Sequence, residues 1–462
     1  MILPANAANR VLAVLVKGSG YTSMSHLATA INDLGRQKYG LNLGYDYKSI
    51  KRWLLGSDCE RPDLVAEVLS NAWGTDITPA LIWPHTRNGA APLPAHRHPF
   101  VADRTLKELA TFVRRDMLCQ DASPTSMVPV IAGPEFADAI VRWYDTAAIG
   151  ISASDTKGTQ RTDTSAVEGV ERATTRLMAS EAEFGGMLTR DAAVGQLKSA
   201  VDLINASTYD DTTGNRLLAA VATLAGTVGH MSYDSGLDGP AQHYFTFALQ
   251  AARESTDERA PLTAVRILAD MARQLRSLDQ PHAAMRLIDL AVSILPGQHT
   301  AVRAMLWNLK ANVLASTATS GLSEVRGLID LAANLRDESR DEAQPSWQRD
   351  IFPDVTEAGL HREATGAYLR LATTNPTHAR ELARSAETEA LQSLAASDPT
   401  RRRERAHSQI DLAQARFLLG DTEQARTDAE EAARLTSLVP GSARLRVRLR
   451  EMLIAERMEP PQ

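Results

Sequence analysis

Residues 412–432 read LAQARFLLGDTEQARTDAEEA and contain the pattern that decides the fold. Gly420 marks a turn between two helical stretches, and Ala425, Ala429 and Ala432 recur every three or four residues in the second one. Positions at this spacing lie on one face of a helix, and small side chains there let two helices approach closely. The stretch therefore predicts two antiparallel helices joined by a short turn.

The same hairpin pattern recurs upstream, with an anchor residue near the start of each second helix. The anchors lie 43, 41, 54 and 46 residues apart, and we interpret 341–353, within the widest interval, as an insertion. Such regular hairpins are typical of an α-solenoid, in which each unit buries its apolar face against its neighbours. They resemble tetratricopeptide repeats but are longer than that unit of about 34 residues. An irregular helical domain is the alternative. The anchors are Ala241, Ala284, Val325, Ala379 and Ala425.

Length and composition agree with an all-α fold of several parts. Hydrophobic residues make up 44% of the 462 residues and aromatic residues only 5%, which favours helices packed through small and unbranched side chains. A chain of this length exceeds one compact core. We expect a small helix-turn-helix domain over residues 1–84, a Pro-rich linker with connecting helices over 85–165, and a tetratricopeptide-like α-solenoid over 166–462.

The first 84 residues predict a bundle of short helices. Glycines follow the first helix, Gly40 and Gly44 mark a turn, and Ser23 or Ser25 can cap the second helix. The expected helices cover residues 6–17, a stretch that includes 27–34, 47–55 and 62–73, with a helical turn near 78–82. Further helices are expected over 105–119 and 134–148, and a loop over 149–165.

The segment 46–56 is the most informative part of this bundle. Ile50 lies on its apolar face, and at 100° per residue Lys48 and Arg52 point almost directly away from Ile50. A short helix with a basic, hydroxyl-bearing front can enter the DNA major groove. A solvated helix face is an equally good interpretation from the residues alone. The candidate DNA-binding residues are Tyr47, Lys48, Ser49, Lys51, Arg52 and, in the preceding helix, Ser25.

Charge is unevenly distributed along the chain. Residues 1–57 carry seven basic and two acidic side chains, whereas the formal charge of the whole chain is −6. A basic head on an acidic body suggests that the head alone binds a polyanion, although chance unevenness on a solvated surface gives the same pattern. A second basic cluster, at 401–405, includes Glu404 and is interpreted as a solvated helix start.

Residues 5–84 resemble the N-terminal region of XRE-type helix-turn-helix regulators of filamentous actinobacteria, which carry a C-terminal tetratricopeptide region. The resemblance rests on YDYKSIKRWLLG at 45–56 with Arg61-Pro62 after it, and it continues at 183–192 and 229–236. This chain departs from the pattern at Tyr47, where the family usually has a basic residue, and at His230, where it usually has Trp. Its stretch after Gly56 is also shorter and poorer in proline.

The resemblance implies a DNA-binding homodimer that represses developmental or secondary-metabolic genes, with a layout like that of peptide-sensing quorum regulators. Stacked hairpins form a concave groove that suits a peptide or a small signalling ligand. Asn308 and Asn312 share a helix face and could clamp a peptide backbone, although exposed asparagines on a solvated face are commoner. The candidate ligand-binding residues are Arg266, Asp270, Arg273, Asn308 and Asn312.

Several classes of function find no support in the sequence. It contains no phosphate-binding glycine loop and no nucleophile elbow, so an enzyme is not expected. Cys59 and Cys119 form neither a disulfide framework nor a zinc site, and His96 with His98 lacks further ligands, so we expect no metal and no cofactor. No membrane segment is expected, and a reducing, cytoplasmic location fits. The alternative function is a protein-interaction scaffold whose helix-turn-helix no longer binds DNA.

Overall fold

The computed structural model describes residues 9–73, 77, 79–83, 105–118, 130–131, 134–144, 160–317, 321–342 and 345–456. Residues 84–104, with the Pro-rich part of the predicted linker and the pair His96 and His98, lie outside these residues, as do Cys119 and most of the loop predicted over 149–165. The chain divides into two compact units, one of Met1–Pro99 with Lys107–Pro129 and one of Phe100–Leu106 with Val130–Gln462. The described residues are overwhelmingly helical, which confirms the all-α class.

Short helices build the N-terminal unit, close to where the sequence predicts them. Ser23, and not Ser25, caps the second helix by accepting a hydrogen bond from the backbone of His26. Gly40 ends that helix in the left-handed region, with φ 65°, where glycine avoids steric strain. The helices are α1 (Arg10–Gly18), α2 (Met24–Tyr39), α3 (Tyr47–Leu54), α4 (Pro62–Trp73) and α5 (Pro79–Ile82); α6 (Thr105–Leu118) follows later in the chain.

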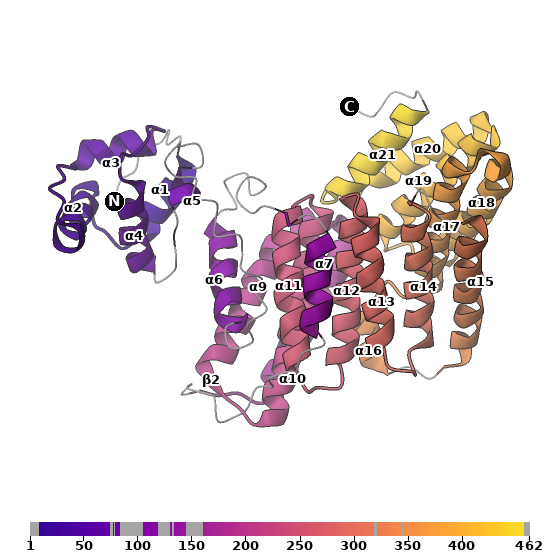
Figure 1. Cartoon of the computed structure of the whole chain (residues 1–462), viewed down its shortest axis with the longest axis horizontal. Coiled ribbons are helices and arrows are strands. Elements are labelled where there is room, and N and C mark those ends of the chain that lie inside the picture. Colours follow the sequence, from indigo (N-terminus) through magenta and orange to yellow (C-terminus); the bar gives the residue numbers. More distant parts are fainter. Residues whose placement is uncertain are drawn as a thin grey trace. The chain divides into compact units, whose positions relative to one another are not determined.

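The second unit is a helical repeat-like array (Figure 1). It begins with α7 (Pro134–Tyr144), which packs on α13, and with α8 (Thr164–Phe184) and α9 (Gly186–Ala206). Two short strands, β1 (Gln160–Arg161) and β2 (Ser207–Thr208), pair in parallel and were not predicted. Within the described residues, five helical hairpins follow: α10 (Asp211–Asp234) with α11 (Asp238–Glu254), α12 (Ala260–Ser277) with α13 (Pro281–Ile294), α14 (Thr300–Leu314) with α15 (Leu322–Glu338), α17 (Glu357–Thr374) with α18 (Ala379–Ala396), and α19 (Arg402–Leu419) with α20 (Thr422–Ser437).

Every predicted anchor residue lies in the first turns of the second helix of a hairpin. Ala241, Ala284, Val325 and Ala425 are fully buried there, because a side chain no larger than valine lets the two helices approach. The segment 341–353, which we interpreted as an insertion, contains α16 (Ser346–Ile351), a short helix between the third and fourth hairpins, and η4 (Ser339–Asp341) ends at its first residue. A second short turn, η5 (Pro376–His378), precedes α18.

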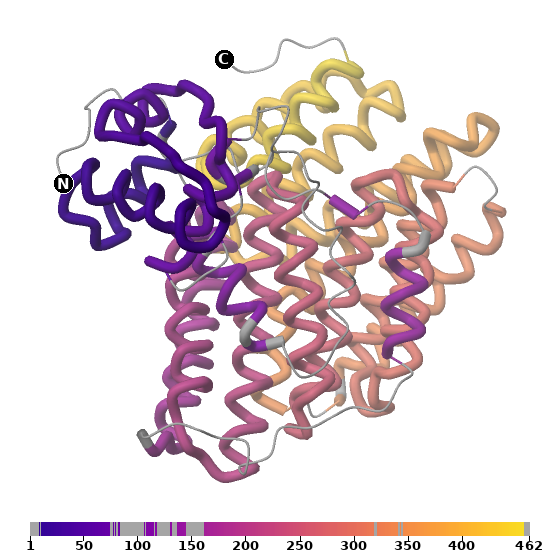
Figure 2. Tube along the Cα trace, turned by 60° about the vertical axis from the view of Figure 1, so that its left-hand side comes forward, coloured from indigo at the N-terminus to yellow at the C-terminus, as the bar shows by residue number. Residues whose placement is uncertain are grey.

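The array curls so that its last helices return to its first ones, as the tube view also shows (Figure 2). The final helix, α21 (Ala443–Ala455), contacts α10, and α19 contacts α8. The backbone N–H of Gly441 donates to the carbonyl of Phe184 at 2.9 Å, and the hydroxyl of Ser442 donates to Asp234 at 2.7 Å. The first helices of the hairpins therefore face an interior that is closed by residues from both ends of the array.

No helix in the described part of the chain combines the length and the apolar character that crossing a membrane requires.

Candidate functional site

The first candidate site is the exposed face of α3, whose start is fixed by a capping box. The carboxylate of Asp46 accepts a hydrogen bond from the backbone N–H of Ser49 at 2.9 Å, and the Ser49 hydroxyl accepts one from the backbone of Asp46 at 3.4 Å. Hydrogen bonds from Ser49 lower the pKa of Asp46, which keeps the cap ionised. An ionised carboxylate at this end also complements the helix dipole.

The inner face of α3 is held by aromatic packing. Ile50 and Leu54 are fully buried, and Trp53 packs edge-on against Tyr45, with 4.9 Å between ring centroids, and against Trp83, with 6.0 Å. This packing fixes the rotation of α3 about its axis, because turning the helix would expose its large apolar side chains.

The outer face of α3 carries cations without acidic partners. Tyr47 is 48% exposed, and Lys48, Lys51 and Arg52 are all exposed. Among the described residues, no carboxylate lies within 4.0 Å of these three cations. Elsewhere in the unit, the cations that pair with carboxylates are Arg36 with Asp33 at 3.2 Å, Lys38 with Glu67 at 2.5 Å and Arg61 with Asp63 at 2.5 Å. Free positive charge therefore gathers on the outer face of α3.

The two candidate serines differ in position. Ser25 is exposed near the start of α2. Ser49 is only 5% exposed, and its hydroxyl donates to the Asp46 carboxylate at 3.1 Å. The prediction that Ser49 belongs to the outward-facing set is therefore wrong in this conformation, because the capping box engages its only side-chain donor. Ser49 positions the cations beside it.

The second candidate site is the interior of the array, where three of the predicted ligand-binding residues lie on α12. Arg266 is 9% exposed and donates to the backbone carbonyl of Ile351 at 2.5 Å. Asp270 is 5% exposed and pairs with Arg273 at 3.0 Å, and Arg273 also pairs with Glu363 at 3.1 Å. We expected these residues to face an open groove. They are instead bound to other parts of the array.

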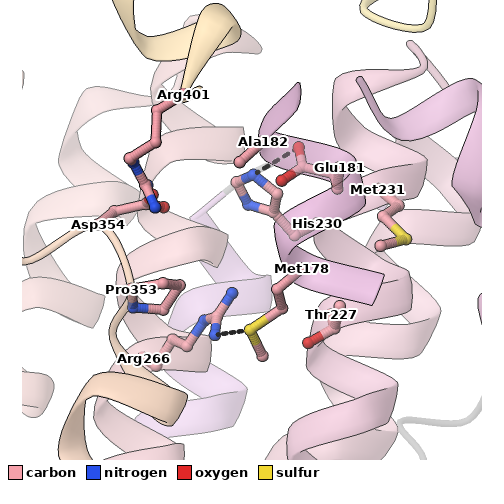
Figure 3. Close-up of a pocket in the computed structure, with 10 residues that line it drawn as sticks. All are labelled: Met178, Glu181, Ala182, Thr227, His230, Met231, Arg266, Pro353, Asp354 and Arg401. Carbon is pink, nitrogen blue, oxygen red and sulfur yellow. Dashed lines mark hydrogen bonds and ion pairs between the residues drawn. The ribbon is translucent and has the colours of Figure 1, made fainter. Parts of the chain in front are cut away.

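A network of charges surrounds these residues, and part of it is drawn in Figure 3. His230 lies between two carboxylates: its Nε2 is 3.7 Å from Glu181 and its Nδ1 is 3.6 Å from Asp270. Arg403 pairs with Glu181 at 2.7 Å and with Asp234 at 3.4 Å. Charges buried this deeply are tolerated only when they are paired.

The pKa values follow from burial and from these pairs. Burial opposes protonation of His230, but Asp270 and Glu181 outweigh it and raise the pKa of His230. Burial likewise opposes ionisation of Asp270, yet His230, Arg266 and Arg273 lower its pKa to about 2. Burial dominates at Glu181 and raises the pKa of that carboxyl despite Arg403. At His230 and Asp270 the attraction between opposite charges therefore outweighs the cost of burial, whereas at Glu181 it does not.

Two further sequence expectations are corrected by this interior. Asn308 and Asn312 do share a helix face, but each is 4% exposed, and both side-chain amides donate to α17, to the Leu360 carbonyl at 3.1 Å and to the Glu363 carboxylate at 3.0 Å. Part of the basic cluster at 401–405 is likewise not solvated. Arg401 pairs with Asp354 and Arg403 with Glu181, so both guanidinium groups are paired within the array.

Little open space remains among the predicted ligand-binding residues. A cavity of about 10 Å³ lies between Arg266, His230, Asp354 and Arg401, which is room for about one water molecule (Figure 3). A larger cavity of about 220 Å³ lies outside this network, between α8, α10 and α16. Its lining includes Thr174, Thr223, Arg259, Trp347 and Asp350. None of the five predicted ligand-binding residues lines the larger cavity.

The interior also contains functional-site candidates that the sequence analysis missed. Glu181, Asp234, Asp354 and Glu363 come from helices or loops far apart in the chain, so their spacing gave no signal. The closest signals were two stretches of sequence. Residues 183–192 begin two residues after Glu181, and residues 229–236 contain both His230 and Asp234. Among the residues that the structure describes, no cluster of three or more His, Cys, Asp or Glu side chains could hold a metal ion.

A family model described as the SP15 N-terminal domain matches residues 12–82. The matched region runs from the third residue of α1 to the last residue of α5, so it coincides with the N-terminal bundle and leaves the array uncovered. No curated protein matches the chain.

Proposed function

We propose that this protein is a DNA-binding transcriptional regulator, in which α3 is the recognition helix and the array mediates dimerisation and signal sensing. The observation that carries the proposal is the outer face of α3, where Lys48, Lys51 and Arg52 are exposed and free of acidic partners among the described residues. Such a face can donate hydrogen bonds to phosphates and to guanine edges.

The support of α3 suits this role. Its start is capped by Asp46 and its inner face is anchored by Trp53, so the basic side chains project from a rigid element. Rigid presentation lowers the conformational entropy lost on binding. Lys48, Lys51 and Arg52 would contact phosphates or bases, and Ser25 would contact the backbone from the start of α2. Tyr47 stands where the regulators that this chain resembles usually have a basic residue, so at this position the protein would contact bases differently from them.

A dimer would present two recognition helices to half-sites about 34 Å apart, one turn of the duplex. The resemblance to actinobacterial regulators supports repression as the outcome of binding. The cavity of about 220 Å³ beside α16 has room for a small signalling ligand or a peptide side chain. If the array has two arrangements that differ in DNA affinity, a ligand that binds one arrangement more tightly than the other would change the DNA affinity of the protein.

The proposal is tested by recovering genomic fragments bound by the full chain and by a Lys48→Ala, Arg52→Ala double variant. We expect the wild type to enrich specific fragments and the double variant to lose that enrichment. Lys38→Ala is the matched control, since Lys38 already pairs with Glu67 and its removal should leave enrichment unchanged. If wild type and double variant enrich the same fragments equally, α3 is not the recognition helix. If the wild type enriches no fragment, the protein-interaction scaffold is the better account.

A further inference from the structure

A cluster of arginines lies near two buried carboxylates of the array, Glu363 and Asp411, and opposes the effect of burial on their pKa values. It consists of Arg276 at the end of α12, Arg362 and Arg370 on α17, and Arg448 on α21. All four residues are half-buried. We call these four residues the arginine cluster.

The acidic groups nearest to the arginine cluster are largely engaged. Glu363 pairs with Arg273 at 3.1 Å and accepts a hydrogen bond from Asn312 at 3.0 Å. Asp411 pairs with Arg448. Among the described residues, no carboxylate lies within 4.0 Å of Arg276, Arg362 or Arg370. Three of the four cations are therefore left without a direct ion pair, while Glu363 and Asp411 attract them at longer range.

Individual nitrogen atoms of the arginine cluster also lack hydrogen-bond acceptors. Nη1 of Arg276 and Nε of Arg362 are buried, and neither has a hydrogen-bond partner. Arg370 donates to two neutral oxygens, Asn312 Oδ1 at 2.5 Å and the Gly366 carbonyl at 2.9 Å. Buried donors without acceptors are rare in folded proteins, and they often mark a place that a ligand fills.

Arg276, Arg370 and Arg448 act on one another electrostatically. Burial, with the charges of Arg276 and Arg448, lowers the pKa of Arg370 to about 9. Burial, together with the charges of Arg273 and Arg448, also lowers the pKa of Arg276, while Glu363 and Tyr233 oppose this effect. Such shifts mean that the unliganded array bears mutual repulsion among these cations, which a bound anion would relieve.

We propose that the arginine cluster binds the phosphate group of a small ligand, held between Arg276, Arg362 and Arg370. A phosphate monoester carries close to two negative charges and three terminal oxygens, and guanidinium groups bind such oxygens through paired N–H donors. A single carboxylate offers one charge and two oxygens, which leaves more of the positive charge uncompensated. Free phosphate and a phosphate monoester share this chemistry.

Gly366 leaves room for the Arg370 side chain beside Asn312. A Cβ atom at Gly366 would lie 2.7 Å from Nδ2 of Asn312 and 3.3 Å from Nη1 of Arg370, so any larger residue would displace both groups. The glycine thus keeps the Arg370 head group beside Asn312.

The test measures thermal unfolding and calorimetric binding of the full chain with inorganic phosphate, O-phosphoserine and malonate, each against sodium chloride at matched ionic strength. We expect phosphate to raise the melting temperature beyond chloride. Tighter binding of O-phosphoserine would identify a monoester ligand, and tighter binding of inorganic phosphate would identify the free ion. If malonate stabilises the protein and phosphate does not, or if no anion exceeds chloride, the proposal is wrong.

The variants Arg276→Gln and Arg362→Gln separate binding from folding. Each removes a cation that lacks a direct ion pair, and Glu363 keeps its pair with Arg273, so we expect a melting temperature in chloride close to that of the wild type and phosphate binding that is at least about tenfold weaker. Arg434→Gln is the control, because Arg434 pairs only with Glu431 on the surface of α20, and phosphate binding should be unchanged. A variant that fails to fold, or that binds phosphate like the wild type, contradicts the proposal. No DNA is involved, so either outcome leaves the proposed DNA binding untouched.

Discussion

The side-chain amide of Asn32 binds both backbone groups of Tyr45. Its Nδ2 donates to the Tyr45 carbonyl at 2.8 Å, and its Oδ1 accepts the Tyr45 N–H at 3.1 Å. The pair joins α2 to the last residues of the turn before α3, directly ahead of the Asp46 cap. These two hydrogen bonds therefore tie the turn before α3 to α2, in addition to the packing of Trp53 on Tyr45.

Replacing Asn32 with alanine should loosen α3 while leaving its exposed charges in place. Two partly buried backbone groups of Tyr45 lose their partners, which costs about 1–3 kcal/mol. Hydrogen exchange of residues 47–54 should accelerate, and DNA affinity should fall with it. The control is Asn71→Ala, on the exposed side of α4. Unchanged exchange in Asn32→Ala would show that the turn is held by other contacts.

The packing of α10 on α11 depends on a glycine. A Cβ atom at Gly229 would lie 2.6 Å from the ring of Phe245, which is fully buried and cannot move aside. Gly229→Ala should therefore lower the free energy of unfolding by about 1–3 kcal/mol. Gly195→Ala on α9, where a Cβ meets nothing within 4 Å, should raise it by about 0.5–1 kcal/mol. Urea unfolding of the two variants should show these opposite signs, and equal signs would contradict the packing described here.

His407 makes the array sensitive to acid. Burial and the nearby Arg448 and Arg362 hold the pKa of His407 well below its usual value, so the folded chain excludes a proton that the unfolded chain binds below about pH 6.5. The free energy of unfolding should fall as the pH drops below that value, by up to about 1.4 kcal/mol per pH unit. In His407→Gln this fall should be smaller, as measured by urea unfolding at about pH 5 and about pH 7. An equal fall in the variant would assign the acid sensitivity to other groups.

His230 should show the opposite dependence. Its pKa is raised in the folded chain, so its protonation contributes stability that is fully present below about pH 6.5 and is lost as the pH rises through the raised pKa. His230→Gln should therefore lose more stability, relative to the wild type, at about pH 6 than at about pH 9. The comparison uses the same urea unfolding measurement. A loss that grows with pH would mean that the charge of Arg403 dominates at this site.

The helices could be predicted because their signals are local. The bounds of α4, Pro62–Trp73, match the predicted segment, and the anchor residues fall in the second helices of the hairpins. Both signals are periodic apolar or small residues next to caps, turn glycines or prolines, which act over a few residues. The apolar and basic faces of α3 followed from the same rule.

The interior of the array could not be predicted because its partners are distant in sequence. Helical periodicity placed Asn308 and Asn312 on one face correctly, but their acceptors are more than 50 residues away on α17. The hydrogen bond that closes the array joins Ser442 to Asp234, 208 residues apart. Whether a polar helix face lines an open groove or a filled interior depends on such closure, which spacing along the chain does not encode.

The most direct test of DNA recognition by α3 is the salt dependence of DNA affinity. The wild type should bind its best genomic fragment with an affinity that falls steeply with salt, because each phosphate contact contributes about 0.9 to the slope of log K against log salt. Lys48→Ala, Arg52→Ala should bind at least about tenfold more weakly with a slope shallower by up to about 2, while Lys38→Ala keeps both values. A double variant with the affinity and slope of the wild type would contradict the account.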